Sequence, residues 1–189
     1  MKPDSTPPPE VRLLDRHNAF CGCLVSLRID RVLLPDGREA TREIVMHPGA
    51  VAIVATPSPE SALLVHQYRH ATGAFLWEIP AGKLEEGEAP LDCAHRELEE
   101  ETGYRASEWT ALPSVYTTPG FSNERISLFL ASGLTRVRRP TDRDIATCAS
   151  FPARDLQRML QQRALVDAKT VLGLLWAGLL DPSAPEGER

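Results

Sequence analysis

The chain has 189 residues, of which 42% are hydrophobic and 25% charged, proportions that suit one folded domain of ordinary size. Its formal net charge of −5 argues against a protein that binds nucleic acid by neutralising phosphates. No segment approaches the roughly 18 apolar residues of a membrane-spanning helix, and the N-terminus MKPDSTPPPE lacks the apolar core of a secretory signal. We therefore expect a cytoplasmic protein with neither a nucleic-acid nor a membrane partner.

The N-terminal part predicts a tail followed by a small sheet. Residues 1–17 are proline-rich and are expected to be disordered. Residues 19–28 and 40–47 have the composition of strands, and Pro35-Asp36-Gly37 between them is a strong turn signal, so 18–47 is predicted to be a β-sheet segment. Cys21 and Cys23 would then share one strand face as reduced, packed thiols.

The remaining elements alternate irregularly along residues 48–182. Strands are expected at 49–56, 61–68, 75–80, 109–118 and 125–131, and helices at 90–102, 153–160 and 167–180. Pro90 favours a helix start, Gly103 a helix stop, and Asp167 an N-cap. Segment 134–144 is polar and is expected to be a loop, and 183–189 a flexible tail. Without a regular βαβ repeat, the fold class is α+β or a mixed-sheet sandwich.

Four glutamates crowd the predicted helix at 97, 99, 100 and 101. At 3.6 residues per turn, Glu97, Glu100 and Glu101 converge on one arc, whereas Glu99 points about 200° away and is assigned to solvent. Arg96 can bond Glu100, and Leu91, Ala94 and Leu98 can pack against a sheet. Clustered carboxylates suit Mg²⁺ or Mn²⁺, which leave coordination positions for substrate phosphates, although a solvated charged face is the alternative.

The stretch GKLEEGEAPLDCAHRELEEETGY (82–104) resembles the Nudix box, G-x5-E-x7-R-E-U-x-E-E-x-G-U, in which U is aliphatic. The matching residues are Gly82, Glu88, Arg96, Glu97, Leu98, Glu100, Glu101 and Gly103, and Tyr104 alone departs from the pattern. EIPAG, HPGAVAIV, TTPGFSNE with Pro119, and DAKT further resemble the ADP-ribose pyrophosphatase branch. The resemblance covers roughly residues 18–180.

This resemblance implies a Nudix fold, with a mixed β-sheet core sandwiched between helices and an N-terminal antiparallel sheet exchanged in a homodimer. It implies metal-dependent hydrolysis of ADP-ribose to AMP and ribose 5-phosphate. Another nucleotide sugar such as GDP-mannose is an alternative substrate, and a non-catalytic module that senses ADP-ribose is a further alternative.

The resemblance also implies site residues. Glu97 and Glu101 are the expected metal ligands, with Glu100 and the carbonyl of Ala81 completing the set. Arg96 is expected to orient the carboxylates, and Gly82 to allow a tight turn. Substrate is expected at Arg69 on its phosphates and at Glu124 on its ribose side, with Phe20 as a guess for adenine stacking.

One loop departs from the branch pattern. Relatives usually carry an acidic loop with a glutamate as general base, whereas this chain has RRPTDRDIAT at 138–147. The expected base is therefore Asp144 or, less favoured, Asp142, unless a box glutamate or bound hydroxide alone serves. Asp144 is the preferred candidate because it immediately precedes the apolar Ile145, where the chain re-enters regular structure.

Overall fold

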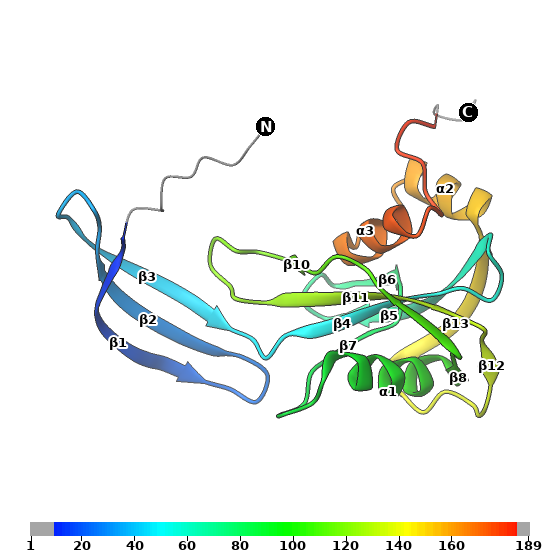
Figure 1. Cartoon of the computed structure of the whole chain (residues 1–189), viewed down its shortest axis with the longest axis horizontal. Coiled ribbons are helices and arrows are strands. Elements are labelled where there is room, and N and C mark those ends of the chain that lie inside the picture. The colour runs from blue at the N-terminus through cyan, green and yellow to red at the C-terminus, as the bar shows by residue number, and fades with distance from the viewer. Residues whose placement is uncertain (1–9, 185–189) are drawn as a thin grey trace. The chain divides into compact units, whose positions relative to one another are not determined.

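The computed structural model describes residues 10–184 and divides the chain into two compact units. The first unit runs to His47 and includes Thr118–Glu124, and the second contains Pro48–Thr117 and the residues from Arg125 onward. The prolines of the expected N-terminal tail, and residues 185–189 of the expected C-terminal tail, lie outside the described residues. Figure 1 shows the elements in chain order.

The first unit is built on a three-stranded antiparallel sheet of β1 (Arg12–Cys21), β2 (Ser26–Leu33) and β3 (Glu39–Met46). Gly37 in the β2–β3 turn has φ of 83°, a conformation that glycine adopts without strain. Asp30 is only 5% exposed, and ion pairs with Arg16 and Arg28 compensate its charge. The turn predicted at Pro35-Asp36-Gly37 is confirmed, since it joins β2 to β3 and the Gly37 amide donates to the Leu34 carbonyl (2.9 Å).

Three expectations for this unit are wrong. Residues 19–28 do not form one strand, because the chain turns after Cys21 and the Gly22 amide donates to the Val25 carbonyl (2.9 Å). Cys21 ends β1 and Cys23 lies in the turn, so both are exposed free thiols instead of packed ones. In addition, β1 begins at Arg12, inside the segment assigned to the tail, because its residues pair with β2.

The second unit contains the mixed sheet. Its strand order is β10-β11-β4-β7, with β9 also paired to β11, and β4 runs parallel to β11. A second, antiparallel sheet has the order β13-β5-β6, and β8 pairs with β12. The bounds are β4 (Ala50–Ala55), β5 (Ser61–Arg69), β6 (Ala74–Glu78), β7 (Ala81–Lys83), β8 (Tyr104–Arg105), β9 (Glu108–Ala111), β10 (Val115–Tyr116), β11 (Arg125–Ser132), β12 (Thr135–Arg136) and β13 (Ile145–Pro152).

Strand β4 places helices on both faces of this sheet. Successive side chains of a strand point to opposite faces, so Val51, Ile53 and Ala55 pack with α1 (Pro90–Thr102). Ala52 and Val54 pack on the other face with α2 (Ala153–Gln161) and α3 (Ala168–Trp176). Figure 1 shows α1 and α3 on opposite sides of β4. The expected sheet core between helices is confirmed.

The ends of the helices follow the sequence signals. Pro90 is the first residue of α1, and Gly103 ends it with φ of 77° while its amide donates to the Glu99 carbonyl (3.0 Å). Asp167 caps α3 by accepting from the Thr170 amide (3.0 Å). The structure describes no helix long and apolar enough to cross a membrane within residues 10–184.

Several expected elements of the second unit differ. The segment 109–118 splits into β9 and β10 around Pro113, which has no amide hydrogen to donate to a strand partner. Strand β13 was not expected, although it pairs with β5 along its length. Helix α3 ends at Trp176, short of the predicted residue 180, and Gly178 follows it with φ of 73°. Leu91 was predicted to pack against a sheet, but it is 40% exposed and lies outside the core.

Candidate active site

The box helix α1 carries two glutamates into the protein interior. Glu97 is 9% exposed and Glu101 is 3% exposed, and each faces the short strand β7. The amide of Ala81 donates to Oε2 of Glu101 at 3.0 Å. Glu100 lies further out, with its side chain 40% exposed. The three carboxylates therefore share one side of the helix, as the helical periodicity predicted, and two of them are buried.

Gly82 gives Glu97 the space that it occupies. A Cβ built on Gly82 would fall inside the carboxylate of Glu97, in contact with its carbon and both oxygens. Any other residue at 82 would therefore displace this side chain or the backbone of β7. The glycine is required by this close approach, because its φ does not lie in the left-handed region.

Arg96 links the carboxylates to the loop before α1. Its Nε and Nη2 donate to the two oxygens of Glu88, both at 2.9 Å. Nη1 donates to Glu97 (2.6 Å) and Glu100 (3.3 Å). The Arg96 guanidinium lowers the pKa of Glu88 to about 2, helped by a backbone hydrogen bond from Glu85. This bidentate bond holds the loop and helix together, and the remaining nitrogen contacts the cluster.

The buried carboxylates resist ionisation. Burial raises the pKa of Glu101 to about 8, and the charges of Glu97 and Asp142 raise it further, against the hydrogen bond from Ala81. Burial also raises the pKa of Glu97, to which Glu100 and Asp142 add repulsion. These side chains stand where their negative charges are costly, and a bound divalent cation would offset that cost.

The donors present fit a hard divalent metal ion. Carboxylate and carbonyl oxygens are the ligands that Mg²⁺ and Mn²⁺ take, and here two buried carboxylates lie beside the glycine-lined backbone of β7. Within residues 10–184, no three acidic, histidine or cysteine side chains already converge in a ligating arrangement. Arg96 engages Glu97 and Glu100 instead, so metal binding would require these side chains to turn.

Asp142 lies close to this cluster, in the loop between β12 and β13. Its charge raises the pKa of both Glu97 and Glu101, and its amide donates to the Glu100 carbonyl (3.2 Å). Its Oδ1 accepts from the Asp144 amide at 2.8 Å. Among residues 10–184, the structure thus places Asp142 at the Glu100 carbonyl and gives Asp144 only its bond to Asp142. Which of the two is the base stays a prediction, and this placement favours Asp142.

Arg69, at the end of β5, also lies near the cluster. Its Nε and Nη2 donate to Glu78 at 2.8 and 2.7 Å, and Glu78 is only 1% exposed. The negative charge of Glu101 helps to raise the pKa of Arg69, after the larger effect of Glu78. Arg69 therefore lies within electrostatic reach of Glu101, with two of its nitrogens held by Glu78.

Two predicted substrate residues belong to the first unit. Phe20 lies on β1 and is 58% exposed. Glu124 lies 3.7 Å from Nε2 of His47, and its amide donates to the Ser122 hydroxyl (3.1 Å). Both residues are separate from the unit that holds the glutamates, and their roles stay predictions.

Comparisons with known proteins identify the family. Residues 46–172 match the model of the NUDIX domain. The chain belongs to the Nudix family. It is thus a Nudix hydrolase. The matched range includes the box at residues 82–104, whose geometry is described above.

Three relatives extend the match to most of the chain. An ADP-ribose pyrophosphatase of Bacillus subtilis is 38% identical over 90% of this chain and 94% of its own length. A methanol dehydrogenase activator of Bacillus methanolicus is 39% identical with the same coverage. An ADP-ribose pyrophosphatase of Mycobacterium tuberculosis is 41% identical over 82% of this chain and 76% of its own.

A solved structure confirms the Nudix fold. The crystal structure of an ADP compounds hydrolase superposes with a TM-score of 0.79, covering 89% of this chain and 92% of that one, at 19% identity. At this identity the likeness concerns the fold alone. Divalent metals are general in Nudix ADP-ribose pyrophosphatases, in agreement with the donor set of this chain.

Sequence reasoning gave no role to Glu78 and Lys169, and it assigned Glu99 to solvent. Lys169 donates to Glu78 and also pairs with Asp167 (3.0 Å), so two cations share the buried Glu78 carboxylate. Glu78 and Lys169 stand in EIPAG and DAKT, which carried the resemblance but received no role. Glu99 does not face solvent as predicted, because Arg105 (2.5 Å) and Arg138 (3.1 Å) cover it.

Proposed function

We propose that the chain hydrolyses the pyrophosphate bond of ADP-ribose, giving AMP and ribose 5-phosphate, with Mg²⁺ as its metal and Mn²⁺ as an alternative. Two relatives at 38% and 41% identity are ADP-ribose pyrophosphatases. The observation that carries the proposal is the buried pair Glu97 and Glu101, packed against a backbone that only glycine at 82 permits.

Glu97, Glu101, Glu100 and the Ala81 carbonyl would hold the metal. When bound, such an ion stabilises negative charge on the pyrophosphate oxygens and lowers the pKa of a coordinated water. Arg96, held by Glu88, pairs with Glu97 on the side of α1 that faces β7, and would release Glu97 to the metal. The buried setting of Glu101 strengthens every charge interaction made there, because water is largely excluded.

Arg69 and Asp142 supply the remaining roles. The Arg69 guanidinium, fixed on one edge by Glu78, binds a phosphate with its remaining nitrogen. Asp142 accepts the proton of the attacking water as oxygen attacks one phosphorus. The bond from that phosphorus to the bridging oxygen then breaks, and the bridging oxygen leaves with the second phosphate. A positioned base of this kind typically contributes about 10²–10⁴-fold.

The first unit is proposed to complete the substrate site in a homodimer. It exposes four apolar side chains, between 45% and 58% each, which a second copy could cover: Val11 before β1, Leu13 and Phe20 on β1, and Leu24 in the turn after it. The proposal places Phe20 against the adenine and Glu124 on the ribose side. A cytoplasmic location, with no nucleic-acid or membrane partner, stays a prediction.

The test is steady-state turnover of a substrate panel with Mg²⁺. ADP-ribose should be cleaved to AMP with the highest kcat/KM, and GDP-mannose and other nucleotide sugars should be poorer. A preference for GDP-mannose would keep the chemistry and change the substrate. Tight binding of ADP-ribose without any product would indicate a sensing module and contradict the proposal. One relative of similar identity is a methanol dehydrogenase activator. Sequence identity alone therefore does not determine the substrate, and the panel is needed.

A further inference from the structure

A loop in the second unit closes over the C-terminal end of α1. The amides of Val137 (2.9 Å) and Arg138 (3.3 Å) donate to the Gly103 carbonyl, and those of Thr141 (2.8 Å) and Asp142 (3.2 Å) donate to the Glu100 carbonyl. The last carbonyls of a helix have no partner within the helix, so the loop supplies donors that α1 lacks.

The approach is close enough to require glycine at 103. A Cβ on Gly103 would fall against the Arg138 carbonyl oxygen, and the residue also has φ of 77°. The loop therefore rests directly on the backbone that ends the box helix. Any shift of the loop at Arg138 would also move Asp142, which lies a few residues along the same segment.

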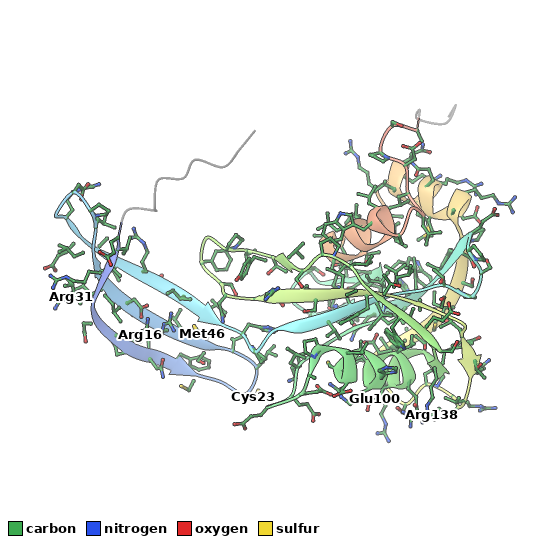
Figure 2. The ribbon with its side chains drawn as sticks, viewed as in Figure 1. Arg16, Cys23, Arg31, Met46, Glu100 and Arg138 are labelled. Atoms are coloured by element: carbon green, nitrogen blue, oxygen red, sulfur yellow. The ribbon has the colours of Figure 1, made fainter. Side chains whose placement is uncertain are left out.

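The Glu99 side chain forms an ion pair with this loop through Arg138. Oε1 of Glu99 pairs with Nε of Arg138 (3.1 Å) and Oε2 with Nε of Arg105 (2.5 Å). The Glu99 side chain is 19% exposed, against 40% for Arg138, so the loop arginine lies partly over the helix. Figure 2 shows Arg138 beside the end of α1 that carries Glu100.

The far end of the same loop carries Asp142 to the buried glutamates. Asp142 acts electrostatically on Glu97 and Glu101, which lie on the opposite side of α1 from Glu99. The loop thus wraps the end of the helix, held by Glu99 on one side and reaching the carboxylate cluster on the other.

We propose that Glu99 is a positioning residue for the reaction: through Arg138 it holds the 137–142 loop on α1, and so keeps Asp142 beside Glu97 and Glu101. The inference rests on the proposed function. The Glu99 side chain pairs with Arg105 and Arg138, and Glu99 occupies the unspecified position between Leu98 and Glu100 in the box.

The kinetic test compares Glu99→Gln with a matched control. Asp155 on α2 likewise pairs with two arginines, Arg154 (3.9 Å) and Arg158 (3.3 Å), so Asp155→Asn removes a similar surface charge from an element outside the site. Glu99→Gln should lower kcat roughly 10-fold with KM nearly unchanged, since small displacements of a reacting group cost about that or more. Glu99→Asp should restore most of kcat, and Asp155→Asn should match the parent.

A double variant separates positioning from loss of fold. If Glu99 acts through Asp142, then Glu99→Gln combined with Asp142→Asn should be no slower than Asp142→Asn alone. Additive losses would mean that Glu99 acts by another route, and the inference would be overturned.

Hydrogen exchange of the metal-free full chain gives a readout independent of activity. Glu99→Gln should speed exchange at the amides of Val137, Arg138, Thr141 and Asp142, and Asp155→Asn should not. Parent-like exchange or parent-like kcat in Glu99→Gln overturns the inference. A parent protein that leaves every nucleotide intact overturns the proposed function instead, and exchange then still reports whether Glu99 holds the loop.

Discussion

Neutralising Glu101 should make the metal-free protein more stable while it abolishes activity. Glu101 is 3% exposed, and burial together with the charges of Glu97 and Asp142 raises its pKa from 4.5 to about 8. Glutamine has nearly the same shape and can still accept the hydrogen bond from the Ala81 amide. The substitution Glu101→Gln therefore removes the charge and little else.

The size of the effect depends on pH. The folded protein keeps a proton on Glu101 at pH values where the unfolded chain has released it, so parental stability falls as pH rises from about 4.5 to about 8. At about 1.4 kcal/mol for each pKa unit, the difference between the pKa values of Glu101 in the unfolded and folded states corresponds to about 5 kcal/mol of stability. Because the side chain can turn partly toward water, we expect roughly 2–5 kcal/mol above about pH 8.

Urea unfolding of both proteins with a chelator present, at about pH 5 and about pH 9, measures this difference. The free energy of unfolding of Glu101→Gln should exceed the parent's at the higher pH and approach it at the lower one. Glu88→Gln is the control of opposite sign: the pKa of Glu88 is lowered to about 2 by Arg96, so its neutralisation should destabilise the protein at both pH values. A Glu101→Gln protein less stable than the parent at about pH 9 would refute the reasoning.

Two further predictions concern the site, and a third concerns the first unit. Gly82→Ala should lose most Mg²⁺ affinity, because its Cβ would displace the Glu97 carboxylate, and calorimetric titration of the folded variant checks this; parent-like affinity would remove Glu97 from the metal site. Asp142→Asn should lower kcat about 10²–10⁴-fold with KM nearly unchanged, while Asp144→Asn stays close to the parent in the same assay. The opposite ranking would return the base to Asp144. A chain truncated before His47 should sediment as a monomer and lose ADP-ribose turnover, and an active truncated chain of unchanged assembly would contradict the exchanged sheet.

The sequence predicted the box helix and the arc shared by its glutamates, because helical geometry is local. Pro90 and Gly103 bounded α1, and the spacing of Glu97 and Glu101 placed both on one arc of the helix. Their burial was not predicted and became visible only in the structure. The same reasoning misplaced Glu99, since the angle around a helix does not reveal that the 137–142 loop covers its end. Tertiary contacts of this kind join residues far apart in the chain.

Other misses have similar causes. The bonds of Glu78 to Arg69 and Lys169 join β5, β6 and α3, so nothing in the local sequence around Glu78 marks the charge cluster. Strand β13 escaped because ATCASF is only weakly apolar, and its pairing with β5 stabilises it. In the first unit, apolar residues on both sides of Gly22 hid a turn inside an apparent strand.

The central claim is that the carboxylates of α1 serve hydrolysis of ADP-ribose, and one measurement tests it most directly. Incubation of the full chain with ADP-ribose, with chelator and then with added Mg²⁺, should give AMP and ribose 5-phosphate in equal amounts only after Mg²⁺ is added. A parallel reaction with Glu97→Gln should give little or none. ADP-ribose that remains intact at saturating Mg²⁺, or is cleaved equally by Glu97→Gln, would contradict the account.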